Sequence, residues 1–267
     1  MQEFISDTQN SEGRDFVVGD IHGTFDILRR AMNKAGFDES KDRLFLLGDY
    51  LNRGKYSLDA IDFLNYSFVK AIKGNHEVMF LDLFDGEKVN INLLAQYQSQ
   101  QNLFTWVKDA SISQLQKLRN SILLLPTARE VLTPRGLVGF VHADVPRGWT
   151  WNEFKNAIKA QNQQLLNYAV WNRSRVENAI SDGVQGVGRV FVGHTVVKSV
   201  HQLGNVYYLD TGSTFRELYP EEDLKLTMAN IVTATQTLST PQNNGSPYQV
   251  LGAFEAPSEN EFGKYTK

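Results

Sequence analysis

The sequence predicts an α/β fold in which parallel strands alternate with helices. Three short apolar runs, residues 15–18, 43–47 and 68–72, have the length of buried strands. Each is followed by a segment with near-helical spacing of apolar residues, so strand and helix alternate three times. This alternation favours a parallel sheet with right-handed crossovers. Polar residues at the ends of such strands meet at one edge of the sheet, where α/β folds place their sites.

The spacing of apolar residues assigns the elements in chain order. Helices are expected over residues 25–35, 58–64 and 77–84, and a longer helical stretch over 149–168. Further strands are expected over residues 122–125, 129–132, 137–141, 190–192, 206–209 and 224–234. The last of these alternates like an antiparallel strand.

These elements predict a single domain with an extension at each end. We expect an N-terminal extension over residues 1–14, a domain over 15–238 and a polar, partly ordered tail over 239–267. Only residues 248–254 of the tail are expected to dock. Residues 89–120 are rich in glutamine and helical in character. We interpret them as a helical insertion or cap over the site.

The composition excludes several classes of protein. The 267 residues include no cysteine, which rules out disulfides, a cysteine nucleophile and thiolate metal sites. A net charge of -3 argues against a dedicated nucleic-acid binder, because such proteins usually have a basic surface. The N-terminal residues lack the apolar core of a signal peptide, and no apolar run approaches the ~20 residues of a membrane span. We expect a cytoplasmic enzyme with neither a nucleic-acid nor a membrane partner.

Three motifs stand where the predicted strands end: Gly19-Asp20-Ile21-His22-Gly23, Gly48-Asp49-Tyr50-Leu51-Asn52-Arg53-Gly54 and Gly74-Asn75-His76-Glu77. Four of the five histidines follow an apolar run or a Gly-Asn turn: His22, His76, His142 and His194. A single histidine of this kind would best be interpreted as structural. Four of them, together with nearby aspartates and an asparagine, indicate a functional site. His201 has no such context and is expected to be structural.

This set of side chains suits a site with two metal ions. Hydrolysis of a phosphate ester needs a strong nucleophile and neutralisation of charge on the phosphate, and two divalent ions ~3.5–4 Å apart supply both. Two ions need a shared carboxylate, for which Asp49 is the candidate. Asp20 and His22 point to the same side of an extended chain, so they can serve one ion. An amide oxygen and two imidazoles remain for the second ion, those of Asn75, His142 and His194.

The motifs resemble those of the calcineurin-like metallophosphoesterases, and more closely of their phosphoprotein phosphatase branch. That branch carries Gly-Asp-x-His-Gly, Gly-Asp-x-x-Asp-Arg-Gly and Gly-Asn-His-Glu, followed by two histidines. The runs Trp171-Asn172-Arg173-Ser174-Arg175 and Gly193-His194-Thr195 look most like the bacterial and bacteriophage lambda-type serine/threonine protein phosphatases. The resemblance spans residues 15–214, and the order and spacing of five motifs make it specific.

The resemblance implies a fold and an activity. The fold is the metallophosphoesterase-type four-layer α/β/β/α sandwich, with residues 89–120 as a helical insertion. The activity is hydrolysis of phosphoserine, phosphothreonine or phosphotyrosine in proteins by direct attack of a metal-bridging hydroxide. Manganese is the expected metal, and iron or zinc would also fit oxygen and nitrogen ligands. The implied location is the cytoplasm of a bacterial cell or of a phage-infected host.

The resemblance also implies roles for single residues. The first metal is held by Asp20, His22 and Asp49, and the second by Asp49, Asn75, His142 and His194. The phosphate is bound by Arg53, Asn75, His76 and Arg173. Arg175 lies near enough in the sequence to replace Arg173. His76 matches the general acid that protonates the leaving alkoxide.

Asn52 departs from the family pattern, which has an aspartate that pairs with the general-acid histidine. Asparagine can orient His76 but cannot supply a charge that favours the imidazolium, so proton donation should weaken. Asn52 marks a natural subgroup, is an introduced substitution, or reflects deamidation or misassignment. The symmetrical diadenosine tetraphosphate hydrolases also lack this aspartate, and their leaving group needs no proton, which makes that activity the alternative. A catalytically weakened phosphate-binding module is a third.

Overall fold

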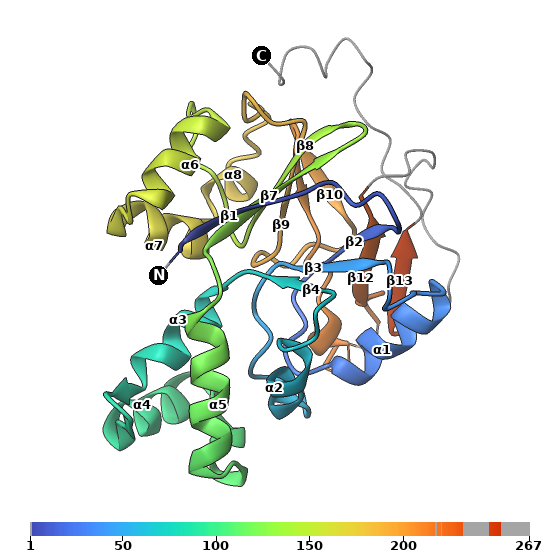
Figure 1. The fold of residues 1–267 in the computed structure, drawn as a ribbon. Helices are drawn as coiled ribbons and strands as arrows, with labels where there is room; N and C mark the ends of the chain where they lie inside the picture. The colour runs from blue at the N-terminus through green and yellow to red at the C-terminus, as the bar shows by residue number, and fades with distance from the viewer. Residues whose placement is uncertain (1, 217, 220, 232–245, 252–267) are drawn as a thin grey trace.

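Two β-sheets packed face to face form the centre of the molecule (Figure 1). This computed structural model describes residues 2–216, 218–219, 221–231 and 246–251. The six-stranded sheet has the order β1-β7-β8-β9-β11-β10, and the five-stranded sheet has the order β13-β12-β2-β3-β4. A hairpin of β5 and β6 forms a third, small sheet.

The six-stranded sheet consists of β1 (Phe4–Asp7), β7 (Ala128–Thr133), β8 (Gly136–Val141), β9 (Arg189–Val192), β10 (His201–Leu203) and β11 (Val206–Tyr208). The five-stranded sheet consists of β2 (Asp15–Val18), β3 (Arg43–Leu46), β4 (Val69–Ala71), β12 (Leu226–Asn230) and β13 (Tyr248–Leu251). The hairpin strands are β5 (Phe84–Asp85) and β6 (Lys88–Val89). The helices are α1 (Phe25–Lys34), α2 (Ala60–Phe63), α3 (Asn75–Asp82), α4 (Ile91–Gln101), α5 (Ile112–Leu123), α6 (Trp151–Lys159), α7 (Gln163–Trp171) and α8 (Ser174–Glu177), with short 3-10 turns η1 (Ser57–Asp59), η2 (Thr105–Asp109) and η3 (Ser213–Phe215).

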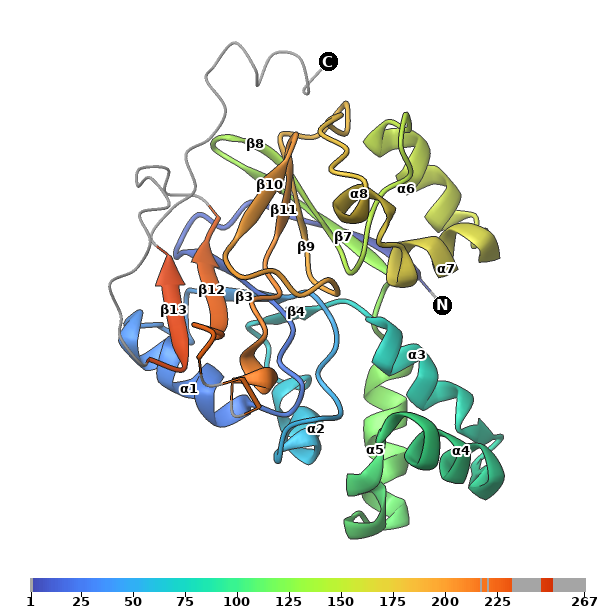
Figure 2. The same ribbon diagram turned by 180° about the vertical axis from the view of Figure 1, so that it is seen from behind.

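Alternating apolar side chains create the four layers. Val17 and Phe45 point between the sheets, where Phe45 stacks on Phe140 of the other sheet with ring centroids 4.4 Å apart. Their neighbour Phe16 faces the opposite way, into a core shared with α1 and α2. The outer face of the six-stranded sheet packs on α6 and α7, around the buried Trp151. The predicted α/β/β/α sandwich is therefore confirmed (Figure 2).

The predicted parallel pairing is present where the motifs lie. Strands β2, β3 and β4 are parallel neighbours, while β12 runs antiparallel to β2, as the alternation over 224–234 predicts. Strand β13 pairs with β12 within the segment 248–254 that was expected to dock. The expected end of the strand over 224–234 and most of the expected tail over 239–267 fall within residues 232–245 and 252–267, which lie outside the described residues. Within the described part of the chain, no helix has the length and apolar character needed to cross a membrane.

Two expectations are wrong. Residues 1–14 were expected to lie outside the domain, but β1 forms an edge strand of the six-stranded sheet, parallel to β7, with Phe4 only 1% exposed. Residues 122–125 were expected to form a strand, but α5 continues to Leu123. The helix continues because Leu115, Leu118 and Ile122 have helical spacing and are all buried on one face.

Helices occupy most of residues 89–120. Helix α4, the turn η2 and helix α5 form a lobe with α3 that extends away from the two sheets (Figures 1 and 2). Asn90 caps α4 and Ser111 caps α5, each by accepting a backbone N–H bond at its helix start. Leu103 and Asn102 of this lobe line a pocket at the ends of the strands.

Candidate metal centre

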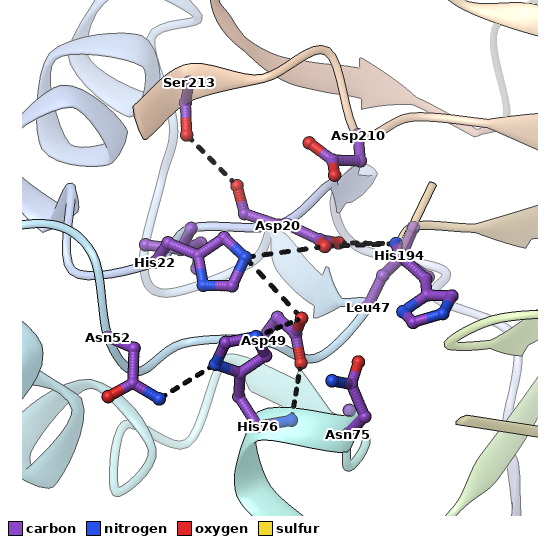
Figure 3. A network of polar contacts seen from close by, with 12 residues as sticks. Asp20, His22, Leu47, Asp49, Asn52, Asn75, His76, His194, Asp210 and Ser213 are labelled. Carbon is purple, nitrogen blue, oxygen red and sulfur yellow. Dashed lines mark hydrogen bonds and ion pairs between the residues drawn. The ribbon is translucent and has the colours of Figure 1, made fainter. Parts of the chain in front are cut away.

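The predicted site residues gather where strands of both sheets end. Asp20 and His22 follow β2, Asp49 follows β3, and Asn75 and His76 begin α3 just after β4. From the other sheet, His142 follows β8 and His194 follows β9. The backbone N–H of His194 donates to both carboxylate oxygens of Asp20 at 3.1 Å, which joins the two sheets at the site (Figure 3). All these side chains are buried.

Asp49 lies at the centre of the cluster, as predicted for a bridging carboxylate. Its Oδ2 is 3.6 Å from Nε2 of His22, and its Oδ1 is 3.4 Å from Nε2 of His142. Asp49 belongs to two groups of side chains whose ligand atoms lie close enough together to hold a metal ion. One group adds His22 and His76, and the other adds His142 and His194. Asp20 approaches the first group, with Oδ2 3.9 Å from Nε2 of His22.

Asn75 approaches the second group. Its Oδ1 lies 3.0 Å from Nε2 of His142. The structure thus brings all six predicted metal ligands into one cluster.

Backbone carbonyl groups set which nitrogen of each histidine faces the site. Nδ1 of His22 lies 2.8 Å from the carbonyl oxygen of Leu51, and Nδ1 of His142 lies 2.7 Å from that of Leu47. A carbonyl oxygen can only accept, so these nitrogens carry the proton and Nε2 keeps a lone pair. In His194 the roles are reversed, because Nε2 donates to the carbonyl of Trp171 at 3.2 Å.

The donor chemistry fits a metal cation. The unprotonated Nε2 atoms of His22 and His142 face carboxylate oxygens of Asp49 without a proton between them, an arrangement that a cation between the atoms would stabilise. Burial lowers the pKa of both histidines, so a proton does not readily take the cation's place. Imidazole, carboxylate and amide donors suit divalent transition metals.

A second buried carboxylate lies beside Asp20. Asp210 follows β11 and is 3% exposed (Figure 3). Burial raises the pKa of Asp210 to about 6, and burial together with the charge of Asp210 raises the pKa of Asp20 well above its usual range. No role was predicted for Asp210, although its position directly after an apolar strand was the available signal.

Glu77 is another residue of the site that had no predicted role. Its carboxylate accepts the backbone N–H groups of Asp49, Tyr50 and Gly74 at 2.7–2.9 Å, so it joins the second and third motifs. Burial and the charge of Asp49 raise its pKa to about 8. Its place in the Gly-Asn-His-Glu motif was the signal.

Two motif glycines make space for the carboxylates. A Cβ atom at Gly74 would lie 2.3 Å from Oδ1 of Asp49, and one at Gly193 would lie 2.0 Å from Oδ1 of Asp20. Both distances are far shorter than a van der Waals contact. Any larger residue at either position would displace a predicted metal ligand.

Arg53 and Arg173 line the same pocket of about 630 Å³ as Asp49, Asn75 and His76. The guanidinium of Arg53 stacks on the ring of Phe215 at 4.7 Å. That of Arg173 donates to the carbonyl of His194 at 2.9 Å and to Oγ1 of Thr195 at 3.2 Å. The lining of the pocket also includes apolar side chains, those of Met79, Leu103, Trp171, Phe215 and Leu218.

Arg175 is not in the pocket. It is 2% exposed and pairs with Asp144 at 2.8 Å, so it cannot replace Arg173.

Asn52 is fully buried, and its Nδ2 lies 2.8 Å from Nδ1 of His76 (Figure 3). The expected contact between position 52 and His76 is thus present. His201 lies exposed on β10.

Comparison with known proteins gives the family. Residues 16–226 match the calcineurin-like phosphoesterase family. Over 201 residues the chain is 30% identical to serine/threonine-protein phosphatase 1 of Salmonella typhimurium, covering 75% of this chain and 87% of the relative. It is also 27% identical to a symmetrical bis(5'-nucleosyl)-tetraphosphatase of Psychromonas ingrahamii, covering 60% of this chain and 59% of the relative.

Solved structures show the same fold. The cold-active protein-tyrosine phosphatase of a psychrophilic Shewanella aligns with a TM-score of 0.52 at 16% identity, covering 85% of this chain and 77% of that one. Enzymes of the matched family are metal-dependent hydrolases with a binuclear metal centre. The cluster around Asp49 has the donors for such a centre. This chain belongs to the calcineurin-like phosphoesterase family.

Proposed function

We propose that this protein is a metal-dependent phosphatase that hydrolyses phosphomonoesters in proteins, at phosphoserine, phosphothreonine and phosphotyrosine. The observation that carries the proposal is the position of Arg53 and Arg173 in the same pocket as Asp49, the residue shared by the two candidate metal groups. Guanidinium groups and cations together provide the positive charge that holds a phosphate dianion. The identity to a serine/threonine-protein phosphatase supports a protein substrate.

In this proposal the side chains of the site divide between binding the metals and binding the phosphate, and Asn75 does both. Asp20, His22 and Asp49 hold the first metal, and Asp49, Asn75, His142 and His194 hold the second. When bound, the two ions acidify a water molecule and neutralise charge on the phosphate.

The arginines bind the phosphate oxygens. Arg53 forms no ion pair with another described residue, so its donors remain available to the substrate. Arg173 is bonded to the carbonyl of His194, which ties a phosphate-binding group to a metal-binding one. Asn75 and His76 complete the phosphate site from the start of α3.

We propose manganese as the metal, with iron and zinc as alternatives that the same donors accept. Loading metal-stripped protein with each ion in turn, and measuring affinity and turnover, tests this order. The cytoplasm of a bacterial cell or infected host remains the predicted location, and cell fractionation tests it.

The main experiment compares manganese-loaded with metal-stripped protein on a phosphopeptide panel, an aryl phosphate and diadenosine tetraphosphate. We expect release of phosphate from the phosphopeptides by the manganese-loaded protein alone. Phosphate release no faster than with the metal-stripped protein would refute the proposal. If even the aryl phosphate is not hydrolysed, the protein is a phosphate-binding module.

The second candidate function is symmetrical hydrolysis of dinucleoside polyphosphates. Asn52 favours it, because a nucleoside diphosphate leaves without a proton, and several relatives carry that name. This function predicts ADP release from diadenosine tetraphosphate at rates far above those on phosphopeptides. Equal or slower release would count against it.

A further inference from the structure

Two groups of the helical lobe fix the orientation of the Asn52 side chain. The backbone N–H of Phe104 donates to Oδ1 of Asn52 at 2.7 Å, and the indole Nε1–H of Trp106 donates to the same oxygen at 3.0 Å. Both groups can only donate, so the atom they meet must be the amide oxygen. Asn52 is fully buried, so bulk solvent does not reach it to satisfy a reversed amide.

The amide nitrogen of Asn52 therefore faces Nδ1 of His76, 2.8 Å away (Figure 3). An amide N–H can only donate, so Nδ1 must accept and carries no proton. The neutral ring then has its proton on Nε2, which lies 3.7 Å from Oδ2 of Asp49 at the pocket. A reversed amide would turn its N–H groups against the N–H groups of Phe104 and Trp106.

We propose that Trp106 is a positioning residue which, through Asn52, holds His76 with Nδ1 unprotonated and Nε2–H directed toward the pocket. In this state His76 donates a hydrogen bond to a phosphate oxygen but does not serve as a metal ligand, because Nε2 has no lone pair. Transfer of that proton would leave an anionic imidazolate 3.7 Å from the carboxylate of Asp49. The leaving group must therefore depart without a proton from His76.

This inference rests on the proposed function and narrows its substrate class. Phenolate is a far better leaving group than an alkoxide, so aryl phosphates depend least on an acid. The site should accordingly hydrolyse phosphotyrosine faster than phosphoserine or phosphothreonine. Trp171 and Phe215 in the lining of the pocket offer apolar surface on which an aromatic leaving group can pack.

Nuclear magnetic resonance of 15N-histidine-labelled protein, loaded with diamagnetic zinc, tests the proton position directly. The His76 signals are assigned by their loss in His76→Gln. We expect Nδ1 in the unprotonated range and Nε2 in the protonated range. A protonated Nδ1 in the unaltered protein would overturn the proposal, whatever the enzyme's activity.

Two variants test how this state is set. In Asn52→Asp, the carboxylate keeps both bonds from the lobe and accepts from His76, so Nδ1 should become protonated. Trp106→Phe keeps a ring against Phe80 but removes one of the two donors, so the Nδ1 signal should move part of the way toward the protonated position. Trp149→Phe, at an exposed tryptophan, is the matched control and should leave the signal unchanged. Identical spectra for Trp106→Phe and the unaltered protein would overturn the role of Trp106.

Kinetics separate failure of this inference from failure of the proposed function. The Asn52→Asp variant should raise kcat on an alkyl phosphate at least about tenfold more than on an aryl phosphate, as expected when an acid protonates the leaving group. Equal gains on both esters would contradict the substrate ranking. Absence of turnover on every phosphate ester refutes the proposed function, while the spectra still decide the proton position.

Discussion

Arg173 and Arg175 are two positions apart in the sequence but lie in different environments. Arg173 is exposed and lines the pocket. Arg175 is buried, where its guanidinium bonds the carboxylate of Asp144 and the carbonyl groups of Val145 and Asp182. A buried ion pair contributes little on its own, but removal of one partner leaves an uncompensated charge. We therefore expect Arg173 to take part in catalysis and Arg175 to stabilise the fold.

Alanine substitutions should separate these roles. Arg173→Ala should lower kcat/KM on a phosphate ester by about 10²–10³-fold, the usual loss for one group that stabilises developing charge, with little change in the free energy of unfolding. Arg175→Ala should lower the free energy of unfolding by ~3–5 kcal/mol. Steady-state kinetics and urea denaturation measure the two effects.

The control is Arg147→Ala. Arg147 pairs with Asp182 on the surface, where such pairs contribute ~0–1 kcal/mol, so neither measurement should change much. Loss of activity in Arg175→Ala at unchanged stability would contradict the assignment.

At the level of elements, β1 connects the N-terminal segment to the third motif. Glu3, just before β1, accepts a bond from Oγ1 of Thr127 at 2.6 Å and pairs with Nζ of Lys73 at 2.9 Å. Lys73 is 7% exposed and directly precedes Gly74. The N-terminal segment thus neutralises a buried charge next to a site motif.

We predict that Glu3→Ala lowers the free energy of unfolding by ~3–5 kcal/mol, because the ammonium group of Lys73 loses its partner. Urea denaturation of the variant, beside Glu39→Ala at an exposed glutamate as the control, measures the effect. A loss no larger than that of the control would show that β1 does not depend on this pair.

The elements that could be predicted are those whose pattern is local. Strands β2, β3 and β4 are short and mostly apolar, and the motifs closely follow them, so the parallel sheet and the metal ligands were both predictable. Strand β1 has only two large apolar residues and becomes a strand by pairing with β7, more than a hundred residues away. Tertiary pairing of this kind leaves no local signal.

The same distinction applies to the site. Asp49 and the histidines were predictable because few residue types bind metals. The carbonyl groups of Leu47, Leu51 and Trp171, which set the histidine tautomers, were not, because every residue has a carbonyl and only the fold selects which one is used. The bonds from Phe104 and Trp106 to Asn52 were unpredictable for the same reason.

At the scale of the whole molecule, the two sheets meet at a cluster of buried acids. Asp20 and His194 are 174 positions apart, and the bond between them holds strand ends of both sheets together. Asp20, Asp49 and Asp210 are each no more than 3% exposed. Without a cation, the fold must keep these like charges close together or protonate them.

Metal binding should therefore stabilise the fold in a pH-dependent way. In the metal-free protein the pKa of Asp210 is raised to about 6, so its contribution to stability is complete below its usual pKa and is lost as the pH rises through about 6. The pKa of His194 is lowered to about 3, so its contribution is lost as the pH falls below its usual value of 6.5. Burial and the charge of Asp210 raise the pKa of the predicted ligand Asp20 well above its usual range, and metal binding needs Asp20 deprotonated and releases its proton.

The increase in unfolding free energy on adding saturating manganese should accordingly be larger at about pH 8 than at about pH 5. At pH 8 the buried carboxylates hold fewer protons than at pH 5, and a ligand at a thousand times its dissociation constant contributes about 4 kcal/mol. At pH 5, a proton on Asp20, whose pKa is raised by burial and by the charge of Asp210, competes with the metal. Urea denaturation with and without manganese measures the increase, and His142→Gln, which removes one ligand of the second metal group, should reduce it at pH 8. An increase of the same size at both pH values would mean that the metal is not bound by these buried groups.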